Sequence, residues 1–132
     1  MVISQDMNSI RRLPDLVNLW DYLSQMVERT DAAIKEITRR LITAAKPRKL
    51  ILFGSFARGD FGPDSDLDIL VIETSVTSKH AEMIRLRKAL RGILVPIDVL
   101  VISEDDFKER SAHPSNVYYW AAREGKVLYE AA

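Results

Sequence analysis

The sequence predicts an α/β (α+β) domain, a small mixed β-sheet with flanking helices. The length of 132 residues leaves room for one hydrophobic core. A strand–helix–strand pattern over residues 67–102 indicates two parallel neighbouring strands with a right-handed crossover. The short connection between the apolar runs at 49–53 and 67–72 favours an antiparallel pair, because parallel strands need a longer crossover.

Hydrophobic periodicity assigns the elements in chain order. Apolar side chains recur at three- and four-residue spacing over residues 15–45, as in an amphipathic helix. The polar stretch at 28–31 predicts either two helices, 15–28 and 31–45, or one long kinked helix. Residues 54–65 are rich in Gly, Asp, Ser and Pro and predict a loop with at most one helical turn. The other expected elements are strands at 49–53, 67–72 and 95–102, helices at 79–92, 104–110 and 114–124, and a final apolar segment at 127–129.

The N-terminal part exceeds what a small domain needs. A helix over residues 15–45 would be roughly 45 Å long at 1.5 Å per residue, which outruns the sheet that it covers. We therefore expect a helical extension over residues 1–30 and the main domain over residues 31–132. The stripe of Trp20, Val27, Ile34 and Leu41 is interpreted as core, with the segment 16–27 as an alternative oligomer or partner surface.

Composition excludes several classes of site. There is no cysteine, so disulfides, iron–sulfur clusters, thiolate zinc sites and cysteine nucleophiles are excluded, and two histidines do not make a histidine cage. A bound metal would need oxygen ligands, which favours Mg²⁺, Mn²⁺ or Ca²⁺. Lys plus Arg and Asp plus Glu are both 19, so we expect no bulk attraction to nucleic acid or to a membrane. No apolar run approaches the ~20 residues of a membrane span and no signal peptide is recognised, so a cytoplasmic location is expected.

One segment carries the residues expected for catalysis. Asp66 and Asp68 stand two apart at the entry of a strand, so period two places both carboxylates on one face. Asp98 interrupts another apolar strand, where a charge needs a partner. If these strands are parallel neighbours, and 49–53 is antiparallel to the first, the Gly54–Ser55 turn reaches the same edge. Each pair of carboxylates at ~4 Å would repel by about 4 kcal/mol at an effective dielectric of ~20.

Divalent cations would relieve this repulsion. Mg²⁺ takes oxygen ligands and is usually completed by substrate phosphates, and two such ions can clamp the attacking and leaving oxygens of a displacement. The Gly54–Ser55 turn offers backbone N–H groups and a hydroxyl to a phosphate, and Arg58 offers a cation. Nucleotidyl transfer from a nucleoside triphosphate is the implied chemistry.

The motif resembles that of a known superfamily. Gly54–Ser55, ten intervening residues, Asp66-x-Asp68 and a later strand Asp98 are similar to the signature of the DNA polymerase β nucleotidyltransferases. The Gly-Ser-Phe-Ala-Arg-Gly form, the small size and the C-terminal segment 124–130 resemble the minimal nucleotidyltransferases, the antitoxin halves of HEPN–nucleotidyltransferase toxin–antitoxin pairs. The resemblance covers roughly residues 31–130.

The resemblance implies a specific activity. Asp66, Asp68 and Asp98 would bind metal and act in catalysis, with two Mg²⁺ ions or Mn²⁺ in their place. Gly54 and Ser55 would hold the triphosphate of ATP, and the cation of Arg58, expected from the sequence rather than from the resemblance, would assist them. The reaction would transfer AMP from ATP to a tyrosine of a HEPN ribonuclease toxin, which is neutralised as the partner in a hetero-oligomer.

Two alternatives stay open. A binding-only antitoxin would mask the toxin sterically, a reading that the N-terminal extension and the basic helix at 79–91 favour. An antibiotic-modifying nucleotidyltransferase would act on a small hydroxylated amine, but no second domain is evident to form its acceptor pocket. Other residues are interpreted as structural: His80 and His113 near helix starts, and Tyr118, Tyr119 and Trp120 as packing.

Overall fold

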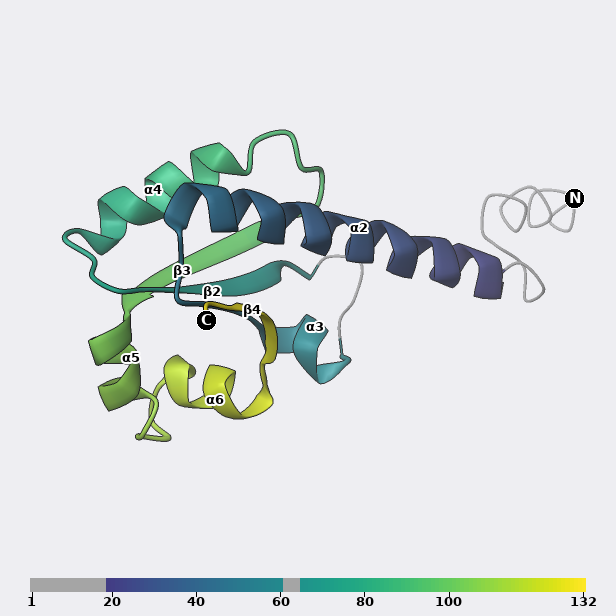
Figure 1. The fold of residues 1–132 in the computed structure, drawn as a ribbon. Coiled ribbons are helices and arrows are strands. Elements are labelled where there is room, and N and C mark those ends of the chain that lie inside the picture. The colour runs from purple at the N-terminus through teal and green to yellow at the C-terminus, as the bar shows by residue number, and fades with distance from the viewer. Residues whose placement is uncertain (1–18, 61–64) are drawn as a thin grey trace, which may run out of the picture. The chain divides into compact units, whose positions relative to one another are not determined.

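The computed structural model describes residues 19–60 and 65–132 (Figure 1). The chain divides after residue 34 into two compact units, and residues 35–132 form the larger one. The first described element, helix α2, spans Leu19–Ala45 without interruption, so over these residues the alternative of one long helix is confirmed and that of two helices is wrong. Thr30 stays helical, and its Oγ1 donates to the Met26 carbonyl oxygen at 2.8 Å. The predicted helix start at residue 15 lies outside the described residues.

The two parts of α2 differ in burial. In the larger unit, Leu41 is fully buried, as the core interpretation of the stripe expects, and Ile37 one turn before it is fully buried as well. In the first unit, Trp20, Leu23 and Val27 are exposed and line a shallow apolar depression. Core packing is therefore the wrong interpretation for Trp20 and Val27. A partner surface over 16–27, like the domain boundary at 30/31, stays a prediction.

Four strands form one mixed sheet in the order β3-β2-β1-β4. Strand β1 (Lys49–Phe53) is antiparallel to both β2 (Leu67–Glu73) and β4 (Lys126–Glu130), whereas β2 and β3 (Ile97–Ser103) are parallel. The expected antiparallel and parallel pairs are thus confirmed. Pairing of the final apolar segment with β1 was not predicted, and it makes β4 and β3 the two edges of the sheet.

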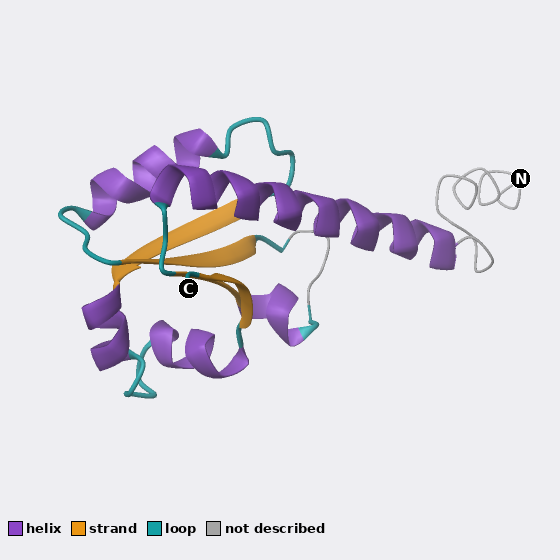
Figure 2. Ribbon diagram, viewed as in Figure 1, coloured by secondary structure: helices purple, strands orange, loops and turns teal. Residues whose placement is uncertain are grey.

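Helices cover both faces of the sheet (Figures 1 and 2). Helix α4 (Lys79–Ala89) lies over one face, and α5 (Glu104–Arg110) and α6 (Val117–Glu124) lie over the other. The second face carries a cluster of Ile51, Leu70, Ile72, Ile102 and Ala121. Side chains alternate along each strand, so the intervening buried residues, such as Ile69 and Val99, belong to the α4 face.

Helix ends differ from the prediction in two places. Helix α4 ends at Ala89 rather than at residue 92 and is closed by Leu90. Helix α6 begins at Val117 rather than at residue 114, and its cap is Asn116, whose Oδ1 accepts from the backbone N–H groups of Tyr118 and Tyr119. Helix α5 has the predicted bounds, and Ser103 caps it by accepting the backbone N–H of Asp106 at its Oγ. No helix in the described part of the chain has the length and apolar character needed to cross a membrane.

Candidate active site

The Gly54–Ser55 turn follows directly from the end of β1. Helix α3 (Gly54–Arg58) begins here, and Gly54 has a φ of +76°, a backbone conformation that favours glycine. A Cβ built on Gly54 would collide with Oδ2 of Asp68. The missing side chain therefore lets the Asp68 carboxylate lie against the start of α3.

Asp68 and Asp98 are neighbours across two strands. Phe53 pairs with Asp68 in the β1–β2 register, and Asp68 pairs with Asp98 in the β2–β3 register. Phe53, Asp68 and Asp98 form a row across the sheet, at the end of the sheet where β1 stops and where β2 and β3 start. Because directly opposed residues point to the same face, both carboxylates lie on the face that carries α5 and α6. The structure thus brings together the residue pair that the sequence places on separate strands.

The negative charge of a third carboxylate, that of Asp66, acts on Asp68. Burial raises the pKa of Asp68 above its ordinary value, and the negative charges of Asp98 and Asp66 raise this pKa further. The positive charge of Arg58 acts in the opposite direction. Asp66 itself is exposed and directly precedes β2, whose first residue Leu67 donates its backbone N–H to the Pro96 carbonyl oxygen at 2.9 Å.

The predicted phosphate-binding residues lie on α3. Ser55 is the second residue of this helix and is partly buried, and Arg58 is its last residue and is exposed. Nε of Arg58 lies 3.5 Å from Oδ2 of Asp60, so this guanidinium forms a surface ion pair near the carboxylates. The roles of Ser55, Gly54 and Arg58 in holding a triphosphate stay predictions.

The donor set is suited to a divalent cation. Asp68 and Asp98 offer carboxylate oxygens side by side, and the crowding that raises the pKa of Asp68 is relieved when a cation binds. Within residues 19–60 and 65–132, however, no three His, Cys, Asp or Glu side chains converge as a ready metal cluster. Asp68 and Asp98 are therefore paired as expected for a metal site. Asp66 acts on this pair through its negative charge, but it does not converge with them as a third metal ligand.

Arg87 is a neighbour of the site that the sequence motif does not include. It lies on α4, and its Nη2 is 3.4 Å from Oδ1 of Asp98. Arg87 and Asp98 are eleven residues apart in the sequence, with the turn at 90–96 between them. No helical or strand spacing therefore relates the two positions. The sequence signal was limited to the excess of basic residues on this helix.

Comparisons with known proteins agree with this geometry. Residues 32–129 match the nucleotidyltransferase domain family, and the chain belongs to that family. The protein is therefore a nucleotidyltransferase, with the mixed sheet and flanking helices expected for it.

Individual proteins and one solved structure resemble this chain. The chain is 35% identical over 104 residues, which is 75% of this chain and 97% of the relative, to a "putative protein adenylyltransferase" of Methanocaldococcus jannaschii. A second protein of that description and organism is 44% identical over 41 residues, 30% of this chain and 41% of the relative. The crystal structure of a "putative nucleotidyltransferase" from Sulfolobus solfataricus superposes with a TM-score of 0.51 and 25% identity, over 78% of this chain and 93% of that one.

Proposed function

We propose that this nucleotidyltransferase is a metal-dependent protein adenylyltransferase that transfers AMP from ATP to a tyrosine hydroxyl of a partner protein. The observation that carries the proposal is the Asp68–Asp98 pair beside the Gly54 turn. The adenylyl group is favoured by the relative from M. jannaschii, whose name states that activity and whose length is almost fully covered. The motif of this chain resembles that of the minimal nucleotidyltransferases, and this resemblance supports a HEPN ribonuclease toxin as the proposed partner. In this proposal the enzyme neutralises the toxin as a cytoplasmic antitoxin.

The proposed reaction is a displacement at the α-phosphorus. The acceptor hydroxyl oxygen forms a bond to this phosphorus, the bond from phosphorus to the oxygen bridging to the β-phosphate breaks, and pyrophosphate leaves. The hydroxyl proton passes to a base. Asp98 is the candidate for this base because it lies on the edge strand β3, at the outer end of the row formed by Phe53, Asp68 and Asp98. Backbone N–H groups at the start of α3, the Ser55 hydroxyl and Arg58 hold the phosphates.

A divalent cation fits this arrangement. Asp68 and Asp98 would hold Mg²⁺ or Mn²⁺, with Asp66 as the third carboxylate. When bound, the ion supplies positive charge where the phosphates and the developing alkoxide concentrate negative charge. The carboxylates orient the ion, and the glycine at position 54 keeps the space in front of Asp68 free of a side chain.

The test follows the α-phosphate. The purified protein is incubated with Mg²⁺, ATP labelled at either the α- or the γ-phosphate, and the product of the adjacent gene as acceptor, followed by intact mass of the acceptor. Adenylyl transfer attaches the α-label and the mass of AMP, and leaves the γ-label in pyrophosphate. Asp98→Asn is expected to abolish the transfer, whereas Asp105→Asn on the exposed surface of α5 is the matched control.

Steric masking is the competing function. The exposed apolar side chains at Trp20, Leu23 and Val27 favour it, because they offer a surface that binds without chemistry. Neutralisation of the partner by Asp68→Asn without any added AMP would overturn the enzymatic proposal in favour of masking. Transfer of AMP to a small hydroxylated amine, but not to protein, would overturn it in favour of antibiotic modification.

A further inference from the structure

Arg87 contacts the predicted site from outside the motif. Its Nη2 lies 3.4 Å from Oδ1 of Asp98, and both side chains are about half exposed, at 55% and 45%. Asp98 lies on β3, an edge strand of the sheet, so one of its sides faces Asp68 and the other side faces no further strand within the described residues. Arg87 approaches Asp98 from a helix that packs beside this edge strand.

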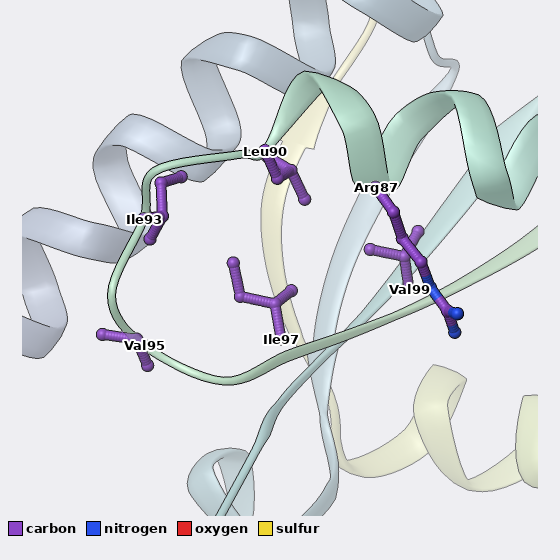
Figure 3. Close-up of a pocket in the computed structure, with 6 residues that line it drawn as sticks. All are labelled: Arg87, Leu90, Ile93, Val95, Ile97 and Val99. Carbon is purple, nitrogen blue, oxygen red and sulfur yellow. The ribbon is translucent and has the colours of Figure 1, made fainter.

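The path of the Arg87 side chain is defined by an apolar groove of about 260 Å³. Figure 3 shows the side chain leaving α4 and passing Val99, with its nitrogen atoms at the end away from Leu90 and Val95. The other lining residues are Ile93 and Ile97. Ile97 and Val99 alternate with Asp98, so they lie on the opposite face of the sheet. The aliphatic stem therefore packs on one face, and the guanidinium reaches the carboxylate on the other, which restricts where the charge can lie.

We propose that Arg87 is a positioning residue that holds the Asp98 carboxylate in its productive orientation; this inference rests on the proposed function. Two carboxylates in adjacent register repel each other, and Asp98 on an edge strand has room to turn away from Asp68. The guanidinium engages Oδ1 of Asp98 and opposes that rotation. Its charge also repels a divalent cation at the same carboxylate, so Arg87 lowers metal affinity while it improves geometry.

These two effects predict changes of opposite sign when the charge is removed. Arg87→Met keeps an apolar stem in the groove and removes the guanidinium. An exposed ion pair is worth up to roughly 1 kcal/mol, so the affinity for Mn²⁺ is expected to rise by up to about 5-fold. Because a small misplacement of a catalytic group costs rate steeply, turnover is expected to fall by about 10-fold. The KM for ATP should change by less than about 2-fold, since Gly54, Ser55 and Arg58 lie on the other side of Asp68.

The experiment compares Arg87→Met and Arg87→Lys with Lys88→Met, the exposed neighbour on the same helix. Mn²⁺ binding to the free protein is measured by electron paramagnetic resonance, and kcat and KM for AMP transfer are measured separately. Arg87→Lys, which retains the charge without the planar fork, should keep the wild-type affinity for Mn²⁺ and recover part of the turnover. Lys88→Met should leave all three quantities unchanged.

A double-mutant cycle separates this inference from the proposed function. In an Asp98→Asn background, Arg87→Met should no longer change Mn²⁺ affinity, because the carboxylate that couples the two is gone. This binding cycle needs no acceptor, so it tests the Arg87–Asp98 linkage even if no AMP transfer is found. The inference is overturned if Arg87→Met matches Lys88→Met, or if turnover, metal affinity and unfolding temperature all fall together, as for a residue that only supports the fold.

Discussion

At the scale of single residues, the site contains carboxylates that repel each other. The Asp68 carboxylate is partly buried, faces Asp98 in the neighbouring strand and is raised in pKa by burial and by two like charges. Stability alone would not select such a cluster, and functional sites are where strained or repulsive arrangements are retained. The cost of the cluster makes its function testable through stability as well as through rate.

Asp68→Asn should stabilise the metal-free protein while it abolishes activity. The substitution removes a charge that is repelled by Asp98 and Asp66 and is partly removed from water. Solvent screening limits the gain to about 1 kcal/mol or less, or about 3 °C in unfolding temperature. Differential scanning calorimetry in a chelator measures the change, with Asp105→Asn as the control. An unfolding temperature below that of the wild type would show that Asp68 contributes to the fold rather than opposing it.

Gly54→Ala should cost both stability and turnover. A Cβ at a φ of +76° is strained by about 1–2 kcal/mol, and here it also meets the Asp68 carboxylate. Gly59→Ala is the matched control, because Gly59 has a φ of +84° but nothing lies within 4 Å of the added Cβ. Chemical denaturation should show a loss for both variants, and kinetics should show a loss of kcat for Gly54→Ala alone. Equal kcat values in the two variants would remove the proposed role of Gly54.

At the scale of secondary structure elements, much of the fold follows from periodicity in the sequence. Apolar runs locate β1, β2 and β3, and connection lengths give the antiparallel and parallel pairs. Strand β4 was missed because its pattern is short, and its ends, Lys126 and Glu130, are charged and exposed. The contact from Arg87 to Asp98 was missed because it depends on how α4 packs beside β3, which local spacing does not encode.

The cap of α6 shows how one side chain defines an element boundary. Asn116 Oδ1 accepts from the N–H groups of Tyr118 and Tyr119, and its Nδ2 donates to the carbonyl oxygens of Arg110 and His113. Asn116→Ala should therefore lower the free energy of unfolding by about 1–2 kcal/mol. Ser115→Ala, at the exposed position next to this cap, should change it by less than about 0.5 kcal/mol. Urea titration distinguishes the two, and the reverse order would contradict the assignment of the cap.

The contact between the end of β2 and α4 predicts a dependence of stability on pH. Burial and a hydrogen bond to Glu82 raise the pKa of Glu73 from 4.5 to about 8, against the opposing charge of Arg85. Between these values, the folded state keeps a proton that the unfolded state releases, so stability falls as pH rises from about 4.5 to about 8.

Glu73→Gln should remove this loss of stability because the amide stays neutral at every pH. The variant is expected to unfold about 3 °C above the wild type near pH 8.5 and close to it near pH 5, a shift of ~1 kcal/mol after screening. Thermal unfolding across this pH range is the measurement, with exposed Glu109→Gln as the control. A constant difference between variant and wild type at all pH values would show that Glu73 does not carry the proton.

At the scale of the whole molecule, ligand binding should appear as increased stability. ATP with Mg²⁺ at about 100 times its Kd would stabilise the folded state by about 2.7 kcal/mol, or roughly 8 °C. Thermal shift measurements should show this increase, and a chelator should remove most of it. Asp98→Asn should reduce the part that depends on metal, because Asp68 and Asp66 remain, whereas Lys88→Met should retain the full shift. A shift that a chelator leaves intact would mean that ATP binds without a cation.

The position of β3 at the border of the sheet bears on the size of the substrate. Asp98 lies one strand further from the Gly54 turn than Asp68 does, and β2 is the only strand paired to its strand β3 in the described chain. Under the proposed function, a folded acceptor protein would present its tyrosine to Asp98 from this side of the sheet, next to Arg87. Such an acceptor would need no deep pocket, and we expect its recognition to depend on the shape and charge of the surface beside β3.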